Sequence, residues 1–159
     1  MVRIYLDPDS EPSEELVLEI RSEDLQLAVS ADYFRLEGTA PTEARTYVLR
    51  RVASLLIQWV RHLKALPLEG HCYLPFDFDP QLRHIGCFRV KRLEGDQLLI
   101  LYGYTAAFAG RPLPPEKALD FDLAEHEFIV DPSYEIFFAS LPELRAGLEA
   151  SIQELLAEA

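Results

Sequence analysis

The tripeptide Asp-Phe-Asp occurs twice in the chain, as Asp77-Phe78-Asp79 and as Asp120-Phe121-Asp122. In an extended backbone, alternate side chains share a face, so each copy would place two carboxylates on one face and the Phe on the other. Paired carboxylates are typical ligands of Mg²⁺ or Mn²⁺, which would suit a metal-assisted hydrolase or transferase. No Gly-rich phosphate-binding loop accompanies them. The sequence therefore favours amphipathic edges, with Phe inward and Asp outward, over a metal site.

A second group with metal-binding side chains consists of His71, Cys72, His84 and Cys87. A structural zinc site needs four ligands, usually in paired spacings, and only His84 and Cys87 have such a spacing. Adjacent residues of a strand point to opposite faces, which separates His71 from Cys72. We therefore expect buried thiols, no metal and no other cofactor.

Acid–base or nucleophilic catalysis finds no support in the remaining motifs. Glu125-His126-Glu127 lacks a partner at helical spacing and is expected to be a solvated strand face. No Gly-x-Ser-x-Gly motif is present. The sequence thus predicts no catalytic residue.

Charge is distributed unevenly along the 159 residues, whose net charge is −12. Residues 1–40 hold ten acids and three arginines, and residues 116–159 hold eleven acids and two basic residues, whereas residues 41–66 hold five Lys or Arg and one acid. An acidic surface repels phosphate backbones and anionic membranes, so we expect no binding to nucleic acid or membrane. The same charge would attract a basic protein.

The stretch from Pro41 to Leu66 is predicted to be the central helix. An apolar stripe recurs at helical period and is formed by Val48, Val52, Leu55, Leu56, Trp59, Leu63 and Leu66. Pro41 suits the first turn of a helix, and Pro67 with Gly70 would end it. A second helix is expected over residues 141–157, because Ser140 and Glu143 have the spacing of a capping box.

The outer face of the central helix carries a cationic stripe, defined here as Arg50, Ile57, Arg61 and Lys64. Ile57 is thus an apolar side chain among three cations. The stripe would be covered by an acidic segment of the same chain, either the loop 7–15 or a C-terminal segment. The alternative is an open stripe that binds a partner or forms the seam of a homodimer.

The other elements are predicted strands. Alternating apolar residues indicate strands near residues 2–7, 16–20, 25–29 and 33–36. Pro75 restricts residues 71–80 to an edge strand or an irregular extended segment. A hairpin is expected from residues 84–93 and 97–105 around Glu94-Gly95-Asp96, followed by strands at 125–130 and 134–138. The chain is therefore predicted to be a single α+β domain, with a largely antiparallel sheet of about five to seven strands and both helices on one face.

The leading functional hypothesis is a non-catalytic acidic module that binds another protein. Small inhibitors and immunity proteins that neutralise basic toxins are similar in size and charge. The expected contact residues are the two Asp pairs and the cationic stripe: Asp77, Asp79, Asp120, Asp122, Arg50, Ile57, Arg61 and Lys64. The alternative is the metal-assisted enzyme. The early acidic residue Asp7 argues against a signal peptide, and no apolar run reaches bilayer length, so a cytoplasmic location is expected.

Overall fold

Two antiparallel sheets and two long helices form the computed structural model, which describes residues 2–7, 15–20, 25–35 and 41–159. The first sheet has the order β1 (Val2–Leu6), β2 (Glu15–Ile20) and β3 (Leu25–Ser30). The second has the order β4 (His71–Phe78), β5 (Ile85–Arg92), β6 (Gln97–Thr105) and β7 (Ile129–Val130), and β8 (Phe137–Ser140) also pairs with β6. The helices are α1 (Pro41–Ala65) and α2 (Leu141–Glu158). Short 3₁₀ turns are η2 (Asp32–Phe34), η3 (Glu94–Asp96), η4 (Pro115–Asp120) and η5 (Glu125–Glu127).

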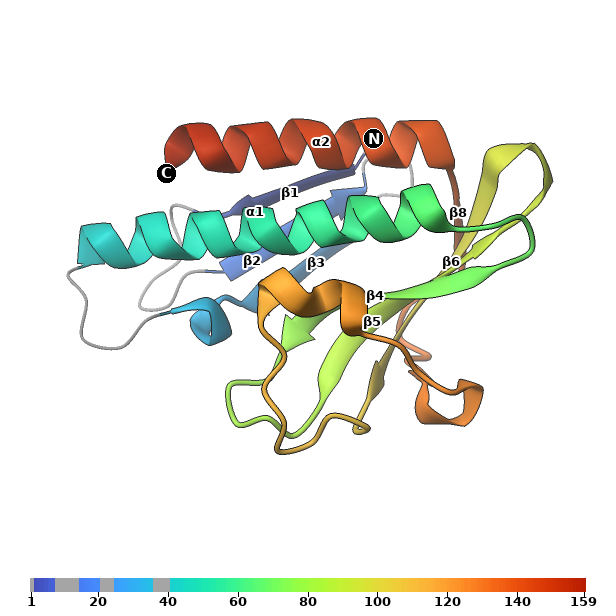
Figure 1. Cartoon of the computed structure of the whole chain (residues 1–159), viewed down its shortest axis with the longest axis horizontal. Helices are drawn as coiled ribbons and strands as arrows, with labels where there is room; N and C mark the ends of the chain where they lie inside the picture. Colours follow the sequence, from blue (N-terminus) through green and yellow to red (C-terminus); the bar gives the residue numbers. More distant parts are fainter. Residues whose placement is uncertain (1, 8–14, 21–24, 36–40) are drawn as a thin grey trace.

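The α+β class and both long helices are confirmed. In Figure 1, α1 runs in front of the three-stranded sheet, and α2 runs beside α1 along the β1 edge of that sheet. The strands form two sheets rather than the expected one, because apolar periodicity identifies extended segments but does not determine which of them pair. No helix in the described ranges is both long and apolar enough to cross a bilayer.

Helix α1 supplies one wall of the core. The predicted stripe is confirmed, because all seven of its members from Val48 to Leu66 are buried. At its centre, Trp59 packs between Phe76 and Phe88 of the second sheet, and its Nε1 donates a hydrogen bond to the carbonyl oxygen of Pro75 over 2.9 Å. Trp59 therefore anchors α1 to the second sheet.

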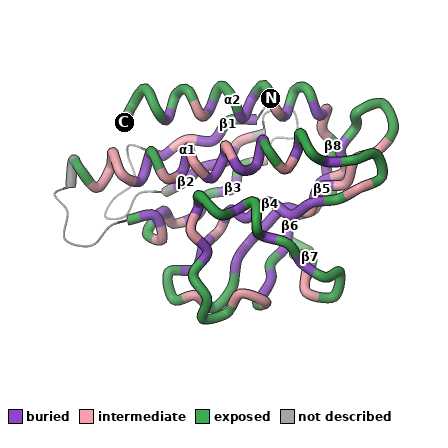
Figure 2. Tube along the Cα trace, in the orientation of Figure 1, coloured by how far each residue is buried: buried purple, intermediate pink, exposed green. Residues whose placement is uncertain are grey.

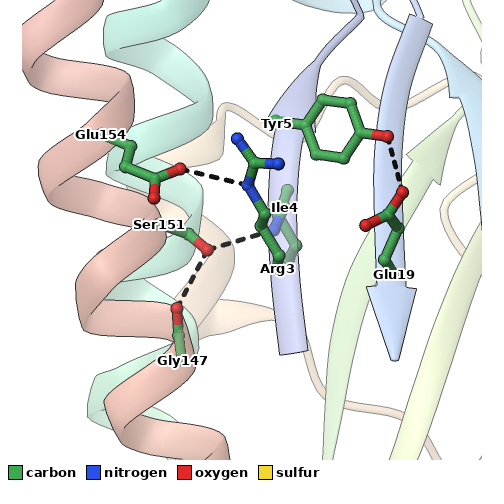
Figure 3. Close-up of polar contacts among 7 residues, drawn as sticks. All are labelled: Arg3, Ile4, Tyr5, Glu19, Gly147, Ser151 and Glu154. Atoms are coloured by element: carbon green, nitrogen blue, oxygen red, sulfur yellow. Dashed lines mark hydrogen bonds and ion pairs between the residues drawn. The ribbon is translucent and has the colours of Figure 1, made fainter. Parts of the chain in front are cut away.

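Helix α2 packs closely against β1, the edge strand of the first sheet (Figure 3). Ser151 Oγ accepts a hydrogen bond from the Ile4 amide at 3.1 Å and donates one to the Gly147 carbonyl at 2.9 Å. A Cβ atom at Gly147 would lie 2.5 Å from the carbonyl oxygen of Val2, so this approach requires glycine. The hydrogen bond to Ser151 satisfies the Ile4 amide, which has no strand partner on the open edge of β1. Ser140 is the N-cap of α2 as predicted, but its hydroxyl makes no capping hydrogen bond.

The predicted hairpin is confirmed as β5–β6, in which Arg92 lies opposite Leu98 and Ile85 opposite Thr105. Strand β4 lies at the edge of its sheet, as Pro75 indicated, and the register shifts between Pro75 and Asp77. Three other strand predictions need correction. Residues 33–34 belong to η2, while residue 36 lies outside the described residues. The run 125–130 contains η5 and the two-residue β7, and of the run 134–138 only residues 137–138 belong to a strand, β8. At η5, the Glu127 side chain accepts a hydrogen bond from the Ala124 amide, and this local bond replaces a strand ladder.

Candidate functional site

The two Asp pairs do not form one site. Asp79 directly follows β4 and holds the next turn: Oδ1 accepts a hydrogen bond from the Gln81 amide, and Oδ2 accepts from the Arg83 amide and from Arg83 Nε at 2.7 Å. These bonds, chiefly the one from the Arg83 side chain, lower the pKa of Asp79 to about 2. Both of its oxygens are therefore used within the chain.

The second pair lies in and after η4, not in the extended segment that the sequence analysis assumed. Asp120 and Asp122 are exposed on either side of Phe121, which is buried. Asp122 Oδ1 accepts a hydrogen bond from the neighbouring Leu123 amide at 2.9 Å. The inward Phe and outward carboxylates agree with the amphipathic interpretation, although Asp120 belongs to a 3₁₀ turn and Phe121 follows it with an extended backbone.

The Cys and His residues are dispersed. Cys72 and Cys87 are buried free thiols on β4 and β5, separated by three positions along the ladder, and burial raises the pKa of Cys72 to about 12. His71 and His84 are exposed. Within the described ranges, no three His, Cys, Asp or Glu side chains are grouped so that they could hold a metal ion.

The cationic stripe of α1 is mostly open. Arg50, Arg61 and Lys64 are exposed and Ile57 is half-buried. Lys64 Nζ lies 4.0 Å from Glu149 Oε1 of α2, so the acidic C-terminal helix meets one end of the stripe. Of the loop 7–15, residues 8–14 lie outside the described residues, so covering by that loop stays a prediction.

Exposed apolar side chains concentrate elsewhere, at the β6 edge where β7 and β8 pair. Eight large apolar side chains of the described residues are exposed, and four of them lie on or beside β7 and β8: Ile129, Val130, Ile136 and Phe138. A fifth, Leu119, lies in η4, which packs against α1. No residue from 124 to 136 is buried, as the green and pink tube around β7 shows (Figure 2). Residues 116–135 also contain seven acids and a single lysine. We call residues 116–138 the acidic edge.

A pocket of about 310 Å³ adjoins the acidic edge at the end of the second sheet. Its floor follows one row of the sheet, in which Asp77 of β4 pairs with Gly86 of β5, Gly86 with Tyr104 of β6, and Tyr104 with Ile129 of β7. The other lining residues are His84, Tyr102, Gly103, Ala106 and Asp131. The pocket therefore lies between Asp77 and the acidic edge.

The absence of a side chain at Gly86 makes room for the Tyr102 hydroxyl in this pocket. A Cβ atom at Gly86 would lie 2.3 Å from the Tyr102 hydroxyl and 2.8 Å from Asp77 Cβ, so the hydroxyl occupies the space above the glycine. Burial raises the pKa of Tyr102. Burial also raises the pKa of Asp77, while nearby His84 opposes that shift and Asp79 adds to it. The pocket thus contains a carboxyl group whose charged form is poorly solvated.

Sequence reasoning included Asp77 and His84 among its candidates but missed Tyr102, Tyr104 and Asp131. In the observed hairpin, Gly86 lies opposite Tyr104. A glycine inside a strand often marks a close approach, and that signal could have located the pocket. Comparisons with protein-family models, with curated proteins and with solved structures find no match to this chain.

Proposed function

We propose that the chain is a non-catalytic binding module that contacts a basic protein through the acidic edge. The observation that carries the proposal is the coincidence of exposed apolar anchors with acidic side chains in residues 116–138. Scattered exposed apolar residues are normal on a surface, but a concentration of them is typical of interaction sites.

The two kinds of side chain would have different roles. Ile129, Ile136 and Phe138 would be desolvated at the centre of the contact, where apolar burial supplies most of the affinity. The carboxylates around them would accelerate encounter with a basic surface and select against acidic proteins. An inhibitor or immunity-type protein that neutralises a basic enzyme is the class we propose, acting in the cytoplasm, where free thiols such as Cys72 and Cys87 stay reduced.

The proposal predicts that two substitutions at the edge abolish partner capture. The intact protein, immobilised and exposed to lysate of its own host, is expected to retain a protein rich in Lys and Arg. The double variant Ile129→Asp/Ile136→Asp should retain at least about tenfold less, because it places charge where apolar anchors must lose water. Quantitative mass spectrometry of the eluates measures the ratio.

Leu156→Asp provides the matched control. Leu156 is 47% exposed on α2 near the acids Glu154 and Glu158, whereas Ile129 is 50% and Ile136 is 56% exposed. The control variant adds negative charge at an equally exposed apolar site and should retain the basic protein. Equal retention by the edge variant, or failure of the intact protein to retain any basic protein, would refute the proposal.

A further inference from the structure

The pocket beside the acidic edge contains two polar groups that nothing in the described part of the chain satisfies. The half-buried carboxylate of Asp77 has neither a hydrogen bond nor an ion pair there. Tyr102 is only 8% exposed, lines the same pocket, and its hydroxyl has no hydrogen-bond partner among those residues either. Within the described ranges, the fully buried polar atoms that lack a partner belong to Tyr73, Arg89, Arg92 and Arg145, so the oxygens of Asp77 and Tyr102 are open to the pocket. A ligand in the pocket would replace water at two groups that the described chain leaves unpaired.

The chemistry of the lining indicates what kind of ligand it suits. A carboxylate only accepts hydrogen bonds, and the Tyr102 oxygen can accept one as well, so the lining favours a ligand that carries several hydrogen-bond donors. Asp131 lies at the rim, with Oδ1 already accepting from the Ser133 amide and its other oxygen available to a charged ligand. The Tyr104 ring, 42% exposed, offers an aromatic face to a cation.

His84 is the only basic side chain in the lining, and it is turned toward another group. Its Nδ1 lies 3.6 Å from Asp79 Oδ2, and its ring meets the Tyr104 ring edge-on. The pocket thus has one imidazole against two carboxylates, Asp77 and Asp131. No third ligand completes a metal site among the described side chains, so an organic cation fits the lining better than a metal ion.

We propose that the pocket receives the guanidinium or ammonium head of a single Arg or Lys side chain from the basic partner. This inference rests on the proposed function and adds the residue type that the partner inserts. The pocket is continuous with the acidic edge, because Tyr104 pairs with Ile129 and the Asp131 amide donates to the Tyr102 carbonyl oxygen over 3.0 Å. One inserted cation would therefore fix the position of the partner on the acidic edge, where its apolar side chains would contact Ile129 and Val130.

The test uses a small probe and the full-length protein. Nα-acetyl-arginine amide and Nα-acetyl-lysine amide are titrated into the protein, and the amide resonances of Gly86 and Gly103 are followed by NMR. We expect saturable shifts with one or both probes. The neutral isostere Nα-acetyl-citrulline amide should produce none, because it lacks the charge.

Two pocket variants and one matched control separate specific binding from general charge. Asp77→Asn should weaken the probe about tenfold or more, as loss of a charge-assisted bond does, and Tyr102→Phe about fivefold. Asp120→Asn removes one exposed acid outside the pocket and should leave the affinity within about twofold. Thermal midpoints close to that of the parent protein verify that the variants are folded.

Three results would overturn the inference: no saturable shift at Gly86, equal binding of the citrulline probe, or equal weakening by Asp120→Asn. If the probes do not bind but retention of a basic protein still depends on Ile129 and Ile136, this inference is wrong and the proposed function stands. If no basic protein is retained but a probe binds saturably and depends on Asp77, the proposed function is wrong. The pocket then binds a cation that belongs to another ligand.

Discussion

Replacement of Trp59 by alanine is expected to lower the free energy of unfolding by about 3–5 kcal/mol, the range of large core truncations. The side chain is 2% exposed and packs 5.8 Å from Phe76 and 5.9 Å from Phe88, measured between ring centroids. Truncation would leave a cavity between α1 and the second sheet. It would also leave the Pro75 carbonyl without its side-chain donor.

Urea unfolding followed by circular dichroism measures the loss, since the chain has only one Trp and the variant loses its fluorescence signal. Trp59→Phe is the control, because it keeps an aromatic ring and removes the indole N–H. It should cost less than the alanine variant. A loss below about 1 kcal/mol for Trp59→Ala, as at an exposed site, would contradict the packing of α1 described here.

Replacement of Asp79 by alanine should cost about 1–3 kcal/mol at pH 7, because the amides of Gln81 and Arg83 lose their shared acceptor in a partly buried turn. The cost should depend on pH. The pKa of Asp79 is lowered from 3.8 to about 2 in the folded chain, so its carboxylate stabilises the fold above about pH 4, and that contribution disappears as the pH falls toward 2.

Unfolding curves of parent and variant at pH 7, 4 and 2.5 check this dependence. The stability difference should be largest at pH 7 and shrink at pH 2.5. Asp120→Ala, at an exposed carboxylate in η4, should change stability by no more than about 0.5 kcal/mol. A difference between parent and Asp79→Ala that stays constant with pH would show that the carboxylate charge does not hold the turn.

The sequence predicted those parts of the fold that depend on local patterns. The stripe around Trp59 follows from helical periodicity, and the hairpin follows from Glu94-Gly95-Asp96 between two β-rich runs. The sequence did not predict which strands pair when the partners are far apart in the chain. Nothing in the alternation of residues 2–30 separates those strands from the second sheet, and the local bonds of η5 overrode the extended pattern of 125–130.

The candidate site was only partly accessible to sequence reasoning for the same reason. Asp77 and Asp79 look equivalent in sequence, but Arg83 closes a turn on Asp79, whereas Asp77 projects over Gly86 into a pocket. Likewise, Ile129 and Val130 suggested a strand, and only the structure shows that their side chains stay exposed at its edge. Apolar periodicity indicates which residues share a face of a helix or strand, but not whether another element covers that face.

The most direct test of the account is site-specific photo-cross-linking inside the host cell. A photoreactive benzoylphenylalanine replaces Ile129 on the acidic edge in one variant and Leu156 on α2 in another, two positions with nearly equal exposure of 50% and 47%. The account predicts a covalent adduct with a basic protein from position 129 and none from position 156. An adduct from position 156 alone, the same adduct from both positions, or no adduct with a basic protein from position 129 would contradict it.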